Sequence, residues 1–194
     1  MQERQVTIDG ESHALAAGFF VVATQNPIEL EGVYPLPEAQ LDRFLVRIEM
    51  SLPAPGAELE MLRQSVSGAL DAPPAAAASV GGLPPSAALA LRGASRHVHV
   101  ADELLDYLLR LAAAARSSPQ VELGISPRAV LALLEASRGA ALLGGRDFVA
   151  PDDVKRLLAP CWAHRMLLTP EAELEGHTAG QILAQVAAAE PVPH

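Results

Sequence analysis

One short stretch near the N-terminus sets the tightest limit on the fold of this chain. Residues 19–23 form the apolar run FFVVA, which breaks abruptly into the polar sequence TQNP at residues 24–27. An uncharged run rich in β-branched and aromatic residues predicts a strand buried on both faces, as in a parallel sheet. Parallel sheets bind their ligands just beyond the C-terminal ends of their strands. Asn26 is therefore a candidate to face a bound ligand.

The composition indicates a globular protein with a helical core. Half of the 194 residues are hydrophobic but only 4% are aromatic, so alanine, leucine and valine must fill the core. The net charge of −9 argues against sequence-independent nucleic-acid binding, which needs clustered lysine and arginine. Cys161 is the single cysteine and can form no internal disulfide, and the N-terminus has no secretion-signal pattern, so we expect a cytoplasmic protein.

A stretch of twenty uncharged residues, 72–91, has the length of a membrane-spanning helix. Four prolines and two glycines interrupt it, and most of its apolar residues are alanine. We therefore expect no membrane span and interpret residues 72–85 as a linker.

The first part of the chain, residues 1–52, predicts short strands joined by turns. Alternating residues around an Asp-Gly pair predict a β-hairpin near residues 5–12. The buried strand follows at 18–23, a short helix is expected at 38–42, and alternation over 44–50 predicts a half-buried strand.

From residue 53 onward the apolar spacing becomes helical. Ser126 and Pro127 suit the cap and first position of a helix, whereas Ala150 offers no capping oxygen to another, which forgoes about 1 kcal/mol. Helices are expected at 58–70, 86–96, 102–116, 127–143, 151–165 and 178–189. The predicted fold class is thus α/β followed by all-α.

Several motifs in combination resemble a known family. Two of them resemble the MoxR group of AAA+ ATPases: ATQNP at 23–27 and EGVYPLPEAQLDRF at 31–44. Three more resemble the helical lid of that group: GISPRA at 124–129, GRDFVAPDDVK at 145–155 and AHRMLL at 163–168. The resemblance implies a partial AAA+ parallel-sheet core of the P-loop NTPase type at 1–52, followed by a helical-bundle lid at 53–194.

The resemblance also implies roles for three residues. Asn26 matches sensor 1, which positions the attacking water, and Arg43 matches the arginine finger, which reaches into a neighbouring subunit's site. Arg128 matches sensor 2, which links the lid to the γ-phosphate. An amide and two guanidinium groups suit phosphoryl transfer, which needs a positioned water and neutralised phosphate oxygens.

Each of these residues also has a structural interpretation. Asn26 precedes a proline and could form an Asx turn, and Arg43 could pair with the adjacent Asp42 at the surface. Arg128 could be an ordinary solvated arginine. However, a cation in the first helical turn is disfavoured by about 0.3–1 kcal/mol, which is easier to understand if an anion binds there.

Two motifs that the family's chemistry needs do not occur in this sequence. There is no GxxxxGK[ST] phosphate loop, and no apolar strand ends in an acidic pair that could hold Mg²⁺. We therefore interpret Met1 as an internal methionine of a longer ATPase that binds ATP with Mg²⁺. The isolated chain is then expected not to hydrolyse ATP, and the first 52 residues are expected to be marginally stable.

The family resemblance implies a ring-forming, hexameric ATPase with chaperone-like remodelling or metal-centre assembly activity. It further implies a possible partner with a von Willebrand factor A domain. A helical adaptor without nucleotide chemistry is the alternative, and a magnesium-chelatase ATPase subunit is a third interpretation. The pair His97 and His99 supplies two imidazoles, too few for a metal site, so no metal-binding residues are predicted.

Overall fold

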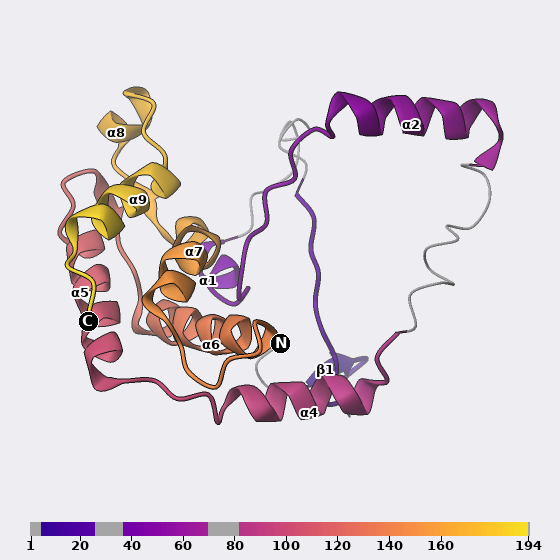
Figure 1. Cartoon of the computed structure of the whole chain (residues 1–194), viewed down its shortest axis with the longest axis horizontal. Helices are drawn as coiled ribbons and strands as arrows, with labels where there is room; N and C mark the ends of the chain where they lie inside the picture. Colours follow the sequence, from indigo (N-terminus) through magenta and orange to yellow (C-terminus); the bar gives the residue numbers. More distant parts are fainter. Residues whose placement is uncertain (1–4, 26–36, 70–81, 194) are drawn as a thin grey trace.

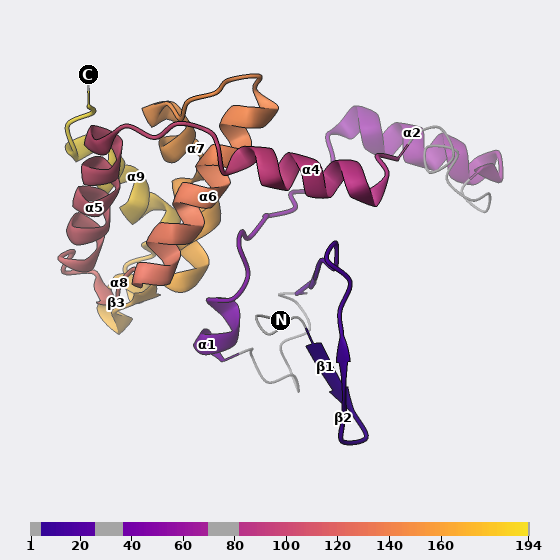
Figure 2. The ribbon, with the colours of Figure 1, turned by 90° about the horizontal axis from the view of Figure 1, so that it is seen from below.

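The computed structural model describes residues 5–25, 37–69 and 82–193. Most of the chain after residue 97 forms a packed helical part, whereas the hairpin and α2 (Pro55–Val66) stand away from it (Figure 1). Figure 2 shows the hairpin separated from the helices, with α1 (Glu38–Leu41) lying between the hairpin and the helical part. The division near residue 52 that the sequence predicts stays a prediction.

Four helices enclose the main core: α5 (Asp102–Arg116), α6 (Pro127–Leu143), α7 (Pro151–Trp162) and α9 (Ala179–Ala189). Their buried side chains include Tyr107, Leu111, Leu133, Leu158 and Trp162. The indole Nε1–H of Trp162 donates a 2.9 Å hydrogen bond to the carbonyl oxygen of Ala129, so α7 is fixed to the first turn of α6. All four helices lie within or close to the ranges that the apolar spacing predicts.

The first turn of α6 forms as its sequence predicts. The Ser126 hydroxyl oxygen accepts a hydrogen bond of 3.1 Å from the N–H of Ala129, and Pro127 occupies the first helical position. The helix ends at Gly144, and Gly145 adopts a φ of 72°, a left-handed conformation that glycine adopts without steric cost.

The capping loss expected at Ala150 is offset by a residue inside α7. The Asp153 carboxylate accepts a 3.0 Å hydrogen bond from the Ala150 N–H and two of 2.7 Å from the Arg146 guanidinium. Hydrogen bonding to Arg146 lowers the pKa of Asp153, and burial only partly opposes this shift. The helix start is therefore capped by a carboxylate that the chain brings from one turn later.

A second, smaller cluster was not predicted from the sequence. Strand β3 (Val121–Leu123) pairs antiparallel with strand β4 (Leu167–Leu168). Strand β4 follows the 3₁₀ helix η3 (Ala163–Arg165). The short helix α8 (Pro170–Leu174) follows, and its Ala172 packs with Leu168 and Ile182 in this cluster. Two- and three-residue strands are too short to give an alternating pattern.

The N-terminal hairpin confirms its prediction. Strand β1 (Gln5–Ile8) pairs antiparallel with β2 (Glu11–Ala14), with Ile8 opposite Glu11. The two turn residues, Asp9 and Gly10, have φ angles of 52° and 86°. Two successive left-handed residues make the type I′ turn that Asp-Gly favours.

The two other strands predicted for the first part do not form. Residues 18–25 and 44–52 have no strand pairing, and Phe20, Ile48 and Met50 are exposed. A strand is stabilised by hydrogen bonds to a neighbouring strand, and the described residues contain only two-stranded sheets elsewhere in the chain. The predictions of a buried strand at 18–23 and a half-buried one at 44–50 are wrong for this structure.

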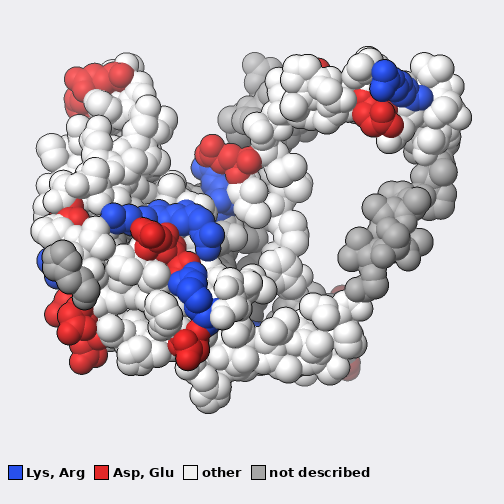
Figure 3. Space-filling model, in the orientation of Figure 1, with Lys and Arg blue, Asp and Glu red and all other residues white. Residues whose placement is uncertain are grey.

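The helices of the middle of the chain form but stay exposed. Helices α2 and α4 (Pro85–Ser95) contain no buried residue, and much of their surface is uncharged on the face in Figure 3. Most of the predicted linker at 72–85 lies outside the described residues. In the described ranges, no helix is both long and apolar enough to cross a membrane.

Candidate functional site

The structure describes two of the three predicted site residues. Asn26 lies outside the described residues. Arg43 is the second residue after α1, and it is exposed. Arg128 is the second residue of α6, and 45% of its side chain is exposed. The position of Arg128 in a helical first turn agrees with the sequence prediction.

The carboxylate of Asp42 connects the end of α1 with the helical part. Its Oδ2 lies 3.7 Å from Nη1 of Arg128, and its Oδ1 lies 3.0 Å from Nε of Arg165. The hydroxyl of Ser126 donates to the same Oδ1 at 3.4 Å. Asp42 therefore pairs with Arg128 and Arg165 rather than with its neighbour Arg43. Its partners are distant in the sequence: Ser126 is 84 positions and Arg165 is 123 positions away.

The contacts that Asp42 makes with Ser126, Arg128 and Arg165 form what we call the joint, and Arg165 makes the most contacts in it. Its side chain is 3% exposed. Its guanidinium donates to the backbone carbonyl oxygens of Asp42 at 3.0 Å, Phe44 at 2.6 Å and Leu45 at 3.4 Å, and to that of Cys161. Burial lowers the pKa of Arg165, and the Asp42 carboxylate opposes this shift. A buried guanidinium is stable here because carbonyl and carboxylate oxygens surround it.

Further contacts fix the segment after Asp42 against α7 and η3. The Nε2 atom of His164 lies 3.2 Å from the carbonyl oxygen of Phe44, and the Arg47 N–H donates to Pro160 at 2.9 Å. The side chain of Val46 packs against the main core. Residues 42–47, which we call the docked segment, thus join the first part of the chain to the helical part.

Sequence reasoning missed the docked segment. In the sequence, His164 and Arg165 stand out only as part of the AHRMLL motif, and Asp42 only as a possible surface partner of Arg43. The available signal was that AHRMLL and LDRF both belong to motifs of one family. No periodicity within either motif predicts that they touch.

The other candidate groups do not form a second site among the described residues. Burial raises the pKa of Cys161 to about 11, so its thiol stays protonated and packs as an apolar group. His97 and His99 are exposed, and the described residues contain no cluster of three histidine, cysteine or acidic ligands. The structure therefore gives no support for a metal site in the part of the chain that it describes.

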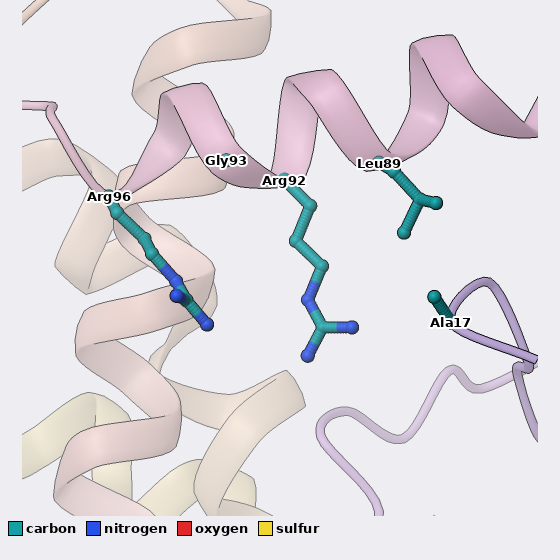
Figure 4. Close-up of a pocket in the computed structure, with 5 residues that line it drawn as sticks. All are labelled: Ala17, Leu89, Arg92, Gly93 and Arg96. Carbon is teal, nitrogen blue, oxygen red and sulfur yellow. The ribbon is translucent and has the colours of Figure 1, made fainter. Parts of the chain in front are cut away.

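A shallow hollow of about 160 Å³ lies beside α4 (Figure 4). It is lined by Ala17, Leu89, Arg92, Gly93 and Arg96, and the two arginines extend from the same side of the helix. Small-molecule sites are usually enclosed clefts of about 300–1,000 Å³. This open hollow is too small to hold a nucleotide by itself.

The residues around Arg128 fit one part of a nucleotide, its phosphates. A half-exposed guanidinium at the start of a 17-residue helix is suited to phosphate oxygens, because its charge and the helix dipole both favour an anion. The Asp42 carboxylate disfavours one, so an incoming phosphate must compete with it for Arg128. Among the described residues, no three histidine, cysteine or acidic side chains cluster as metal ligands would.

Comparisons with known proteins match both parts of the chain. Residues 1–46 match a family model described as ATPase family associated with various cellular activities (AAA), and residues 113–186 match one described as AAA lid domain. Chaperone MoxR1 of Mycobacterium tuberculosis is 42% identical over 184 residues, covering 89% of this chain and 46% of that protein. The chain belongs to the MoxR-type AAA+ ATPases.

Two further relatives extend over the whole of this MoxR-type chain. The uncharacterized protein YeaC of Bacillus subtilis is 40% identical over 198 residues, which is 100% of this chain and 59% of that protein. A crystal structure from Cytophaga hutchinsonii, of a protein assigned as an ATPase, superposes with a TM-score of 0.84 at 30% identity, covering 100% of this chain and 60% of that one. The predicted fold class, a partial AAA+ core with a helical lid, is thus confirmed. The chain spans 46–60% of the length of these three proteins.

Proposed function

We infer that this chain supplies the sensor and lid groups of the nucleotide sites in a ring-forming MoxR-type ATPase. The observation that carries the proposal is the joint around Asp42, which sets Arg128 beside the residue that precedes Arg43. One joint thereby holds Arg128 next to the chain segment that carries Arg43, and the resemblance assigns these two arginines to two different nucleotide sites. The assembled ring couples ATP turnover to chaperone-like remodelling of another protein or complex.

Each residue has a separate task in this proposal. ATP with Mg²⁺ supplies the phosphoryl group and the attacked phosphorus. Arg128 binds phosphate oxygens in its own subunit, and Arg43, exposed just after α1, reaches the site of the neighbouring subunit. Asn26 orients the attacking water. Positive charge at the phosphate oxygens stabilises the transition state, an effect worth about 10³–10⁵ in rate for an arginine finger.

The isolated chain does not hydrolyse ATP in this proposal, because its sequence has no phosphate loop and no acidic pair at the end of a strand. The complete site is formed in a hexameric ring in the cytoplasm, with phosphate-loop and Mg²⁺-binding groups from outside the 194 residues. A protein with a von Willebrand factor A domain is the proposed partner.

The test uses a chimera that joins this chain to the part of Bacillus subtilis YeaC that it does not span. We expect Mg²⁺-dependent ATP hydrolysis by the chimera and none by the 194-residue chain. Arg43→Ala and Arg128→Ala should each lower kcat by at least about 10²-fold. Arg63→Ala, which changes an exposed arginine of α2, is the matched control and should leave kcat unchanged.

Mixing the two inactive variants tests where each arginine acts. A subunit with Arg43→Ala keeps Arg128, and a neighbour with Arg128→Ala keeps Arg43, so some sites in mixed rings contain both groups. Activity should therefore return on mixing. No return would contradict the finger role of Arg43, and an inactive chimera would favour the helical-adaptor alternative.

A further inference from the structure

The two arginines that meet Asp42 are held very differently. Arg165 is almost fully buried and makes four contacts with backbone carbonyl oxygens in addition to its ion pair with Asp42. Arg128 is half exposed, and its ion pair with Asp42 spans 3.7 Å. The pair with Arg165 is thus part of the folded joint, whereas the pair with Arg128 is longer and open to solvent.

The two carboxylate oxygens of Asp42 contact different partners. Oδ1 faces Arg165 and the Ser126 hydroxyl, and Oδ2 faces Arg128. Loss of the Oδ2 contact leaves Oδ1 and its partners in place. A single carboxylate charge at 3.7 Å competes poorly with a triphosphate, which carries several charges and more acceptor oxygens.

We propose that Asp42 is a positioning residue that holds Arg128 against the end of α1 and releases it to a polyphosphate anion. The inference rests on the proposed function, since that function places phosphates at Arg128. It goes further by naming the group that Arg128 leaves. Because Arg43 follows Asp42 directly, occupation of one subunit's site changes the surroundings of the arginine that serves the next site.

The sign of the effect separates release from a purely structural role. If Asp42 only fixed the joint through Arg165, its removal would weaken anion binding or leave it unchanged. If Asp42 competes for Arg128, its neutralisation strengthens anion binding. Asp42→Asn makes this distinction, because the amide keeps an oxygen that can accept from Arg165 and Ser126 and removes the charge.

The experiment titrates the 194-residue chain with inorganic tripolyphosphate and follows the backbone amide signal of Ala129 by NMR. Asp42→Asn should bind about twofold to fivefold more tightly than wild type, the range expected for a half-exposed ion pair. Asp106→Asn, on the exposed side of α5, removes the same charge outside the joint. It should change the affinity by less than about 1.5-fold at 0.1 M salt.

A double variant assigns the gain to Arg128. Asp42→Asn in an Arg128→Gln background should give no gain over Arg128→Gln alone. Equal or weaker binding by Asp42→Asn, a gain that persists without Arg128, or no binding by any variant would overturn the proposal. Failure of the proposed function alone would give a different result. Activity would not return in mixed rings, but Asp42→Asn would still bind tripolyphosphate more tightly than wild type.

A measurement on wild type covers the case in which Asp42→Asn does not fold. During the titration, the amide signals of Asp42 and Arg43 should move together with that of Ala129 and saturate at the same concentration. Movement at Ala129 with no change at residues 42–43 would show that the anion binds without opening the pair, and would also overturn the proposal.

Discussion

The two parts of this molecule contain similar apolar residues, but the helical part buries many of them and the described residues before residue 67 include no buried one. After residue 97, leucines such as Leu108, Leu111 and Leu133 are at most 1% exposed. Before residue 67, Leu52 is 88% exposed and Val66 is 92% exposed. Hydrophobicity alone therefore does not decide which residues are buried. The decisive factor is whether another element offers a matching surface.

Helices and strands differ in what they need from such a surface. The backbone hydrogen bonds of a helix are internal, so α5, α6, α7 and α9 only have to bring their apolar stripes together. A strand also needs a neighbouring strand for its backbone groups. The apolar run at 18–23 meets no other strand among the described residues and stays extended and exposed.

The solved relative makes the comparison sharper. The chain superposes over its whole length on 60% of the Cytophaga hutchinsonii structure, with a TM-score of 0.84. The exposed apolar residues of the first part therefore follow a path that is shared with a larger protein. The docked segment ties this part to the helical core through contacts of Arg165, His164 and Val46.

The largest expected effect comes from one substitution made in both parts. Leu133→Ala removes a fully buried side chain and should lower the free energy of unfolding of the helical part by about 3 kcal/mol. Leu52→Ala should change it by less than about 0.5 kcal/mol, because that side chain is already in water. Urea unfolding followed by the fluorescence of Trp162 measures both. Equal losses would mean that Leu52 is buried in solution, and the contrast between the parts would fail.

A polar contact inside the helical part gives the next effect. Asp153→Asn weakens the double hydrogen bond to Arg146 and should cost about 2 kcal/mol at pH 7. Because the folded pKa of Asp153 is lowered, this stabilisation is present above the unfolded pKa of about 3.9 and is lost as the pH falls through the folded value. Wild type and variant should therefore converge in acid.

The control for that experiment is Asp152→Asn, which changes an exposed neighbour in the same helical turn. It should cost less than about 1 kcal/mol, the usual size of a helix-dipole interaction. If the two variants lose the same stability, charge at the helix start explains both, and the contact with Arg146 contributes nothing of its own.

The helices could be predicted from sequence because their information is local. Residues 102–116 show the complete apolar stripe of α5, and Ser126 with Pro127 marks the start of α6. The Asp-Gly hairpin was predictable for the same reason, since two residues determine its turn. The apolar run at 18–23 predicts burial on both faces, but the described part of this chain does not bury it.

In the candidate site, too, local features could be predicted from the sequence and long-range contacts could not. Arg128 could be placed at a helix start from residues 126–128 alone, and its family role followed from motifs. The ion pairs from Asp42 to Arg128 and Arg165 join positions far apart in the chain, and no local pattern encodes them. Asn26 lies outside the described residues, so its role stays a prediction.

The smallest expected effect tests the contact between the two parts. Burial of His164 lowers its pKa, an effect that nearby Arg165 and Arg47 reinforce and a hydrogen bond to Phe44 partly opposes. The unfolded chain therefore takes up a proton below about pH 6.5 that the folded chain refuses. The free energy of unfolding should be highest above that pH and fall as the pH decreases toward the folded pKa of His164.

His164→Gln should reduce the slope of the free energy of unfolding against pH between pH 7.5 and 5.5, whereas His97→Gln, at an exposed position, should not. Equal slopes in wild type and His164→Gln would mean that the ring of His164 is solvated and that the docked segment leaves η3 in solution.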